Sequence, residues 1–501
     1  MEERMHNINI KTIFIEKNLA DENIIKNFEK AGAEVIPVNV CEFEECNKAS
    51  KTPLFNRAAI GGAELSAAAK AAGVRTVSAN REALANADVK NFLECGRLQP
   101  YETDETGFIE TDIEAEDTGH LESVFALGNG YLGLRGTYDE RDDKIPETPG
   151  MYINEIFETE PIVHPWPCKG FAKNEEYTVN LCDWRITELF ADGEKICFSN
   201  GIKNHRRRLD FRRGEIVRSF DVLLKRGKTL HVESIRLVSL SRVHGAALKY
   251  TVSSLDFDGE LEIRSSVVKN TPINGKITTK TVNEKAEGKA FLLETRTKRT
   301  CMDVAAAVLH TVIAAEYTDE VINSENTYTY TIRAALKPGN AVSLEKYASF
   351  YSAADGADNL AESAMRGAEK NAADGFGTLR SEQAAAWANH WKTGDILIKG
   401  SKADQQAVRF SLFHLKSQLP TVNNASIGAT GLTGPNYSGK VFWDTEMYLM
   451  PYYLFTEPEH CKGLILYRIK LLDKARKRAE EIGNEGALYS WCSIDGEETS
   501  V

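Results

Sequence analysis

HVESIRLVSL, residues 231–240, alternates apolar and polar side chains along its whole length. A two-residue period is typical of a β-strand that buries one face. The same alternation recurs at 247–252, 260–268 and 327–335, the last reading TYTYTIRAA. Asn-Gly, Asp-Gly and Pro-Gly dipeptides separate the runs and mark turns. Many short strands at regular spacing predict a large antiparallel β-sandwich over residues 101–350.

The spacing of apolar residues changes on both sides of residues 101–350. Before it, apolar runs at 10–15, 34–38 and 74–77 alternate with helical patterns at 22–31 and 63–72, so residues 1–100 are expected to form a small α/β segment. After residue 358 the apolar period becomes helical. Candidate helices cover 358–373, 377–392, 403–419, 445–456 and 461–482. The fold class expected is therefore multidomain α+β.

Composition restricts the function. The 501 residues carry 61 basic and 73 acidic side chains, a net charge of −12. Nucleic acids and anionic membranes bind a basic surface, so neither is an expected partner. No run approaches the roughly 20 apolar residues of a membrane span, and the N-terminus lacks a signal-peptide pattern. Nine scattered cysteines without metal-ligand spacing predict reduced thiols, no metal site and a cytoplasmic location.

Two features of the sequence do not indicate a nucleotide-binding, metal or catalytic site. Gly128 to Gly133 fits G-x-G-x-x-G, but the residues that follow do not form a helix pattern. A dinucleotide fingerprint requires that helix, so these glycines are expected to shape loops of the sandwich. His390 and His414 lie on helical stretches beside aromatic residues and are expected to be core or interface histidines.

The strongest candidate site lies in residues 426–455. Phe442-Trp443 runs directly into Asp444 and Glu446 at the start of an apolar helix. Aromatic faces beside carboxylates suit a sugar ring, which has C–H faces and many hydroxyls. The alternative is structural: Asp444 is a favoured residue for capping the helix that begins at Thr445, and the two aromatic side chains then belong to the core.

Two neighbouring features favour the sugar site. The approach to Phe442 holds four glycines, which give more backbone freedom than a helix entry needs: Gly428, Gly431, Gly434 and Gly439. A second loop, residues 494–498 (IDGEE), follows Tyr489 and Trp491 and repeats the order of aromatic residues before carboxylates. Two such loops at helix ends are expected to converge.

The sequence resembles glycoside hydrolase family 65, the maltose, kojibiose, nigerose and trehalose phosphorylases. The matching stretches are 122–136 (ESVFALGNGYLGLRG), 149–160, 209–217, 236–241 (RLVSLS), 431–458 and 486–498 (GALYSWCSIDGEE). The resemblance implies the sandwich, a helical linker over 351–400 and, at 401–501, the first part of an (α/α)6 catalytic barrel. It also implies that Trp443 and Asp444 hold the glucosyl unit of an α-glucosyl disaccharide.

The implied reaction is inverting phosphorolysis, in which disaccharide and inorganic phosphate give β-glucose 1-phosphate and a free sugar. Phosphate is the co-substrate, and no cofactor is implied. The family's general acid is a Glu in a G-P-D-E-Y type loop, and it and the phosphate ligands are expected beyond Val501. Lys440 and Thr499 also depart from the family, where many members have His and Cys. Glu498 is not expected to replace the acid.

These departures lead to two expectations. The chain is expected to be inactive alone, because the general acid and the phosphate ligands are expected beyond Val501. It is also expected to end within the barrel, because five helices do not close a barrel that needs twelve. Apolar faces such as 448–454 are then left exposed. The alternatives are a carbohydrate-binding or complementing fragment of a split enzyme, with a separately encoded C-terminal half, or an inverting hydrolase relative. A homodimer is also compatible with the sequence.

Two questions stay open at this level. Residues 47–88 faintly resemble the tail of a haloacid-dehalogenase-type β-phosphoglucomutase, without that family's D-x-D motif. The sequence does not decide the glycosidic linkage.

Overall fold

A computed structural model describes residues 12–16, 22–30, 33–38, 57–60, 69, 75–77, 101–111, 113, 118–166, 169–198, 201–224, 227–421 and 424–499. The chain forms two compact units, Met1–Glu102 and Thr103–Val501. The predicted limits 101–350, 351–400 and 401–501 within the second unit stay predictions.

The first unit contains a parallel four-stranded sheet of order β2-β1-β3-β4. Its elements are β1 (Thr12–Glu16), α1 (Glu22–Lys30), β2 (Glu34–Val38), β3 (Arg57–Ile60) and β4 (Arg75–Val77). Ile13, Phe14 and Ile15 are all buried, as expected for a central parallel strand covered on both faces. The α/β prediction is confirmed, although β3 was missed. The predicted helix at 63–72 and most of 47–88 lie outside the described residues.

The second unit is built on a ten-stranded sheet of order β19-β20-β21-β24-β17-β16-β15-β14-β6-β5. Neighbours from β19 to β6 are antiparallel. The strands are β5 (Tyr101–Asp104), β6 (Gly107–Glu110), β14 (Ile202–Asp210), β15 (Glu215–Leu223), β16 (Thr229–Val238), β17 (Gly245–Ser254), β19 (Thr279–Glu287), β20 (Ala290–Thr297), β21 (Asp303–Ile313) and β24 (Ala341–Ser352). The quoted stretch 231–240 forms most of β16, so its alternation is confirmed as a strand.

A second antiparallel sheet faces the first and has the order β13-β12-β18-β23-β22. Its strands are β12 (Thr187–Ala191), β13 (Glu194–Lys195), β18 (Gly259–Val268), β22 (Thr318–Asn323) and β23 (Thr327–Leu336). Phe291 of the large sheet stacks on Tyr328 of the small one, with ring centroids 4.6 Å apart. Ser265 meets His310 between the sheets at 2.8 Å. The predicted sandwich is therefore confirmed.

Smaller strands connect the sandwich to the rest of the unit. Two short sheets form from β7 (Leu127–Gly128), β8 (Leu132–Leu134) and β9 (Met151–Ile153), and from β10 (Phe157–Pro161) and β11 (Asn174–Thr178). The G-x-G-x-x-G stretch forms the β7–β8 hairpin, in which Gly130 adopts a φ of +80°. The hairpin continues from β8 into an irregular segment. The prediction that no helix follows the glycines is therefore confirmed.

Helices follow the last strand of the sandwich. They are α7 (Leu360–Asp374), α8 (Phe376–Gly394), α9 (Lys402–Gln418), the π-helical turn η5 (Thr445–Leu449), α10 (Met450–Thr456), α11 (Pro458–Lys470) and α12 (Leu472–Glu481); α6 (Thr118–Val124) precedes β7. Asn359 and Ser401 cap α7 and α9 by accepting a backbone N–H. All five predicted helices exist. Whether they belong to an (α/α)6 barrel stays a prediction.

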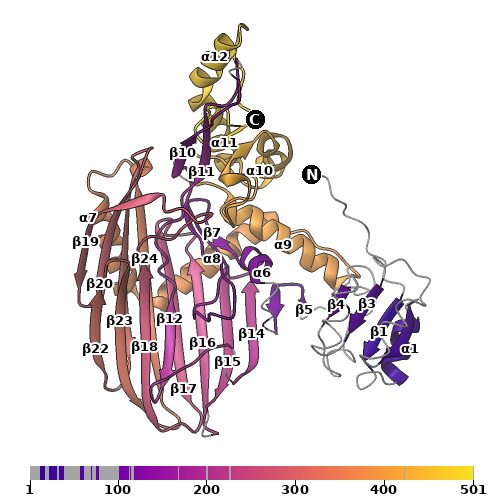
Figure 1. The fold of residues 1–501 in the computed structure, drawn as a ribbon, viewed down its shortest axis with the longest axis vertical. Coiled ribbons are helices and arrows are strands. Elements are labelled where there is room, and N and C mark those ends of the chain that lie inside the picture. Colours follow the sequence, from indigo (N-terminus) through magenta and orange to yellow (C-terminus); the bar gives the residue numbers. More distant parts are fainter. Residues whose placement is uncertain are drawn as a thin grey trace. The chain divides into compact units, whose positions relative to one another are not determined.

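Helices α7 and α8 pack against the large sheet (Figure 1). Ala364 and Ala368 of α7 cover Ala305 and Ala307 of β21, where small side chains allow close approach. Leu379 of α8 packs into a second cluster with residues of β16, β17 and β24. Full burial of such a leucine stabilises the fold by roughly 1.5–3 kcal/mol. The sandwich therefore has helices on its outer face, which carry the chain to α9.

Candidate functional site

The two loops that contain aromatic and acidic residues lie side by side. A two-stranded antiparallel ribbon joins them, in which β25 (Val441–Phe442) pairs with β26 (Cys492–Ser493). Phe442 faces Cys492 in this register, so Trp443 and Trp491 leave the ribbon at the same end. The expected convergence of the loops is confirmed, and the ribbon is its cause.

Trp443 and Trp491 form an exposed aromatic corner. Their ring centroids are 5.4 Å apart and their planes meet at 60°. The residues are 39% and 50% exposed, so neither indole is part of a core. The indole N–H of Trp443 donates to the carbonyl of Ser490 at 2.8 Å, which fixes its orientation. The corner presents apolar faces of the kind on which a sugar ring stacks.

Asp444 does not cap the helix that follows it. Its backbone is already helical, with φ −57° and ψ −31°, and its side chain accepts no hydrogen bond from the helix N-terminus. The capping alternative is therefore wrong. In the part of the chain that the structure describes, this exposed carboxylate has no hydrogen-bond or ion-pair partner. It is available to an incoming ligand beside Trp443.

Two other carboxylates near the corner are engaged by arginines. Glu446 accepts two hydrogen bonds from Arg468, at 2.8 and 2.7 Å, and Arg468 also donates to the carbonyl of Phe442. Glu498 pairs with Arg478 at 2.5 Å and accepts the backbone N–H of Trp491. Such bidentate and charge-assisted bonds are strong and directional. Glu446 and Glu498 therefore hold the loops in place, whereas Asp444 is exposed.

The turn that carries Asp444 into the helices has an unusual backbone. Residues of η5 form a π-helix, in which the N–H of Met450 bonds to the carbonyl of Thr445. Pro451 follows, and proline has no N–H to continue a regular ladder. Single π-turns inside helices occur frequently at functional sites. The hydroxyl of Thr445 anchors the turn by donating to the carbonyl of Ile427 at 2.9 Å.

The glycine-rich approach to the ribbon is tied to the sandwich. Gly439 has φ +72°, and a Cβ there would lie 2.8 Å from the Cβ of Thr178 on β11. The guanidinium of Arg135 donates to the carbonyl of Thr433 at 2.6 Å. Glycine at position 439 is therefore required by close approach as well as by backbone angle.

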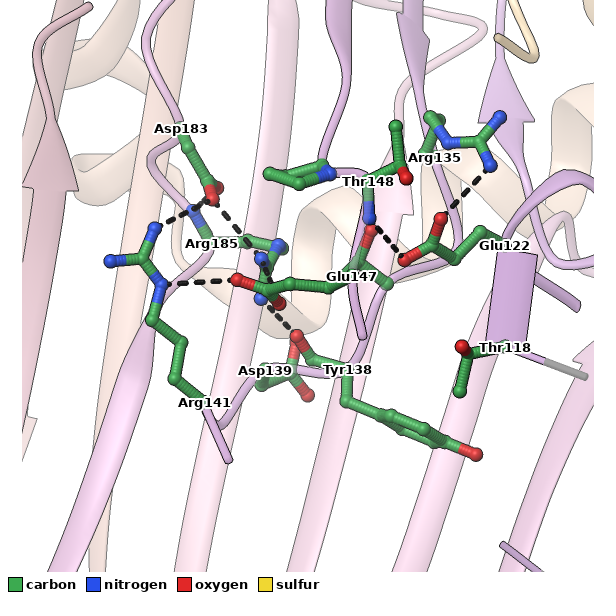
Figure 2. A network of polar contacts seen from close by, with 12 residues as sticks. Thr118, Glu122, Arg135, Tyr138, Asp139, Arg141, Glu147, Thr148, Asp183 and Arg185 are labelled. Atoms are coloured by element: carbon green, nitrogen blue, oxygen red, sulfur yellow. Dashed lines mark hydrogen bonds and ion pairs between the residues drawn. The ribbon is translucent and has the colours of Figure 1, made fainter. Parts of the chain in front are cut away.

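Arg135 is itself part of a buried polar network. Figure 2 shows Glu122 between Arg135 and the backbone of Thr148, at 2.9 Å from each. Further along, Arg185 pairs with both Asp183 and Glu147. Buried charges of this kind are stable only when paired and hydrogen-bonded. The network fixes the segment from which Arg135 reaches the glycine-rich loop.

The second loop is also held from the sandwich side. Glu176 of β11 accepts the backbone N–H groups of Ile494 and Asp495, at 2.5 and 3.2 Å. Tyr467 donates its hydroxyl to the carbonyl of Ile494. Burial raises the pKa of Glu176 to about 7, although the two N–H groups act in the opposite direction. Sequence reasoning missed Glu176 because it lies more than 300 residues away in a hairpin with no motif of its own.

The remaining sequence predictions concern histidines and cysteines. His390 is buried and contacts Glu457 at 3.0 Å, and His414 contacts the carbonyl of Val124, so both are packing histidines as predicted. The five cysteines in the described segments are free thiols. Those segments contain no group of three or more His, Cys, Asp or Glu arranged for a metal. None of the described helices has the length and apolar character to cross a membrane.

The described residues also contain a cavity of about 530 Å3 between α6, α9, the glycine-rich loop and α10. Its lining is mostly apolar and includes Phe410, Leu415 and Tyr453. Trp443 and Asp444 do not line it. The cavity therefore lies apart from the aromatic corner.

The chain thus combines a β-sandwich, helices that follow it, and an exposed tryptophan corner beside an unpaired carboxylate. The sequence pattern described as glycosyl hydrolase family 65, N-terminal domain, matches residues 108–390. The pattern described as the glycosyl hydrolase family 65 central catalytic domain matches residues 409–501. The chain belongs to glycosyl hydrolase family 65.

Individual relatives agree with the family. The chain is 36% identical over 411 residues to an α,α-trehalose phosphorylase of Thermoanaerobacter brockii, covering 78% of this chain and 53% of that protein. It is 28% identical to a kojibiose phosphorylase of Halothermothrix orenii, covering 78% and 50%. A solved putative kojibiose phosphorylase from the human microbiome superposes with a TM-score of 0.74 at 25% identity, covering 80% and 53%. The chain spans about half the length of these relatives.

Proposed function

We propose that this chain is the front part of an inverting α-glucoside phosphorylase, and that Trp443 and Asp444 hold the glucosyl unit of its disaccharide substrate. One observation carries the proposal. Two exposed indoles form a corner beside an unpaired carboxylate, in a member of family 65. Stacking positions the C–H face of the sugar, and Asp444 accepts hydrogen bonds from its hydroxyls.

The proposed reaction inverts the configuration at the anomeric carbon of the glucosyl unit. A general acid protonates the glycosidic oxygen while inorganic phosphate attacks the anomeric carbon from the opposite face. The C–O bond to the leaving sugar breaks, a C–O bond to phosphate forms, and the acid's proton leaves on the released sugar. Glu446 and Glu498 are each paired with an arginine. We assign the acid and the phosphate ligands to residues outside this sequence.

Binding of glucose tests the sugar site. Tryptophan fluorescence of the chain should change on titration with glucose. Trp443→Ala should weaken binding about tenfold, and Asp444→Asn by about 10- to 100-fold, because a hydrogen bond to a charged group contributes roughly 1.5–3 kcal/mol. Asp473→Asn, a change at an exposed carboxylate on α12, is the matched control and should leave binding unchanged. Equal affinities for all four proteins would overturn the assignment.

Product analysis tests the proposal that the general acid lies outside this sequence. With trehalose, kojibiose, maltose or nigerose plus phosphate, the chain alone should release no β-glucose 1-phosphate. Steady release would show that the acid lies within this sequence. Phosphate-independent release of glucose would instead favour the hydrolase alternative.

A second candidate function is that of a complementing fragment, which assembles with a separate C-terminal half. Tyr448 and Phe455 favour it, because they are 70% and 84% exposed on the helices next to the aromatic corner. Exposed apolar surface of this kind marks interaction sites. Release of β-glucose 1-phosphate only after mixing the two halves would support this function.

A further inference from the structure

The hairpin of β10 and β11 is a separate two-stranded sheet and is part of neither sheet of the sandwich. β10 pairs with β11 from Phe157 opposite Thr178 to Pro161 opposite Asn174, and with no other strand in the segments that the structure describes. Figure 1 shows the hairpin beside the C-terminal helices α10 to α12 rather than within the large sheet. A strand from the N-terminal half of the chain is thus placed next to the candidate site.

Two consecutive glutamates on β11 contact the two loops of that site. Successive side chains of a strand point to opposite faces, and Glu175 and Glu176 follow this rule. Glu175 accepts a hydrogen bond from the ammonium of Lys440 at 2.6 Å. Lys440 is buried and directly precedes the ribbon strand that leads to Trp443. The first loop is therefore held by an ion pair.

The second glutamate holds the other loop through its backbone. Glu176 is 2% exposed, and one of its oxygens accepts the N–H groups of Ile494 and Asp495. Its cationic neighbour Lys474 is paired with Asp495, at 2.5 Å. The two backbone N–H groups are thus the hydrogen-bond donors that the structure gives this buried carboxyl, and they belong to the loop that follows Trp491.

We infer that β11 is a two-sided clamp that positions the sugar corner. Glu175 fixes the loop before Trp443 through Lys440, and Glu176 fixes the loop after Trp491 through its backbone. Neither glutamate touches the aromatic rings, so both are positioning residues. The inference rests on the proposed function for its sugar-binding part, whereas the clamp itself is a structural coupling that holds without a ligand.

The surroundings of Glu176 give the clamp a measurable signature. Charged and titratable groups that face it are Asp495 in the loop, Lys474 on α12 and Tyr467 on α11. Burial raises the pKa of Glu176 to about 7, and Asp495 acts in the same direction, while the two N–H bonds and Lys474 oppose it. Loss of the negative charge weakens both N–H bonds, because charge-assisted bonds are about twice as strong as neutral ones.

The test uses the whole chain labelled with 5-fluorotryptophan, with the Trp491 signal assigned by Trp491→Phe. In fluorine NMR between pH 5.5 and 8.5, the Trp491 signal should shift with a midpoint near 7. Glu176→Gln keeps an acceptor oxygen but removes the charge, and should abolish this shift. Glu160→Gln, at a partly exposed glutamate of β10 paired with Lys276, is the matched control and should keep it.

Sugar binding forms the second arm of the test. Glu176→Ala and Lys440→Ala should each weaken glucose binding about tenfold while circular dichroism stays unchanged; if Glu176→Ala misfolds, Glu176→Gln carries this arm at pH 8. A Trp491 signal that does not titrate, or titrates equally in Glu176→Gln, would overturn the clamp. Failure of the unmodified chain to bind glucose, with the pH shift intact, would overturn the proposed function and leave the clamp standing.

Discussion

At the scale of single residues, the sequence identified the aromatic side chains of the site better than its charges. Trp443 and Trp491 are recognisable because large exposed aromatics beside carboxylates have few structural roles. The sequence could not separate Asp444 from Glu446, because what distinguishes them is Arg468, which lies two helices away. The role of Glu176 could not be predicted from the sequence either, because its partners are backbone N–H groups far along the chain.

The protonation of Glu176 should appear in the stability of the fold. Its pKa is raised from an ordinary 4.5 to about 7, chiefly by burial. The folded state therefore retains this proton to higher pH than the unfolded state does. The associated stabilisation is complete below about pH 4.5 and is lost as pH rises toward 7. By linkage the loss is about 3 kcal/mol at most.

Urea unfolding at a series of pH values measures this effect. The free energy of unfolding of Glu176→Gln, relative to the unmodified chain, should rise between pH 4.5 and 7 and level off above it. Glu160→Gln serves as the control, and its difference should show no such rise. A flat difference for Glu176→Gln would show that the buried carboxyl does not titrate in this range.

At the scale of elements, periodicity located the helices but not their breaks. The predicted helix 461–482 is divided at Leu471, where ψ is 0°, into α11 and α12. The apolar pattern continues through the break because Leu464 and Leu471 remain on the buried side. The predicted helix 445–456 likewise contains a π-turn before Pro451. The periodic pattern of apolar residues shows which face of a helix is buried. It does not show where the helix bends or is interrupted.

Glu457 joins four of these helices and should control their response to acid. It lies between α10 and α11, and it contacts His390 of α8, Lys416 of α9 and His460 of α11. Burial opposes ionisation, but these hydrogen bonds together lower the pKa of Glu457 well below its usual value. Its stabilisation is therefore present above about pH 4.5 and lost as pH falls below that value.

Replacement of Glu457 measures this junction. Glu457→Gln should lower the free energy of unfolding at pH 7 by about 2 kcal/mol, because it leaves Lys416 without its anionic partner. It should also reduce the loss of stability between pH 5 and 2. Glu459→Gln, two residues further along and exposed, should change neither quantity. Equal stability of the two variants at pH 7 would contradict the assigned role of the junction.

At the scale of the whole molecule, the sequence predicted the sandwich, the linker helices and an exposed apolar face. The first two follow from periods of 2 and 3.6 residues that hold over many elements. The third follows from the apolar residues 448–454, of which Tyr448 and Leu454 are exposed, whereas Tyr453 packs in a core cluster with residues of α11. What sequence could not predict is how far-separated segments meet, such as β11 beside the 494–498 loop.

A last prediction concerns the exposed apolar side chains of three helices, here called the apolar face. They are Met447 and Tyr448 of η5, Leu454 and Phe455 of α10, and Ile465 and Ile469 of α11. We expect the apolar face to contact the C-terminal half of a family 65 protein. Co-expression with the corresponding half of the Thermoanaerobacter brockii trehalose phosphorylase should give a complex that purifies through a tag on either part. The charged change Phe455→Glu should reduce recovery of the complex at least tenfold, because it places a carboxylate in an apolar contact. Leu397→Glu, at an exposed leucine outside these three helices, should have no effect. Equal recovery with Phe455→Glu would show that the apolar face is not where the two halves meet.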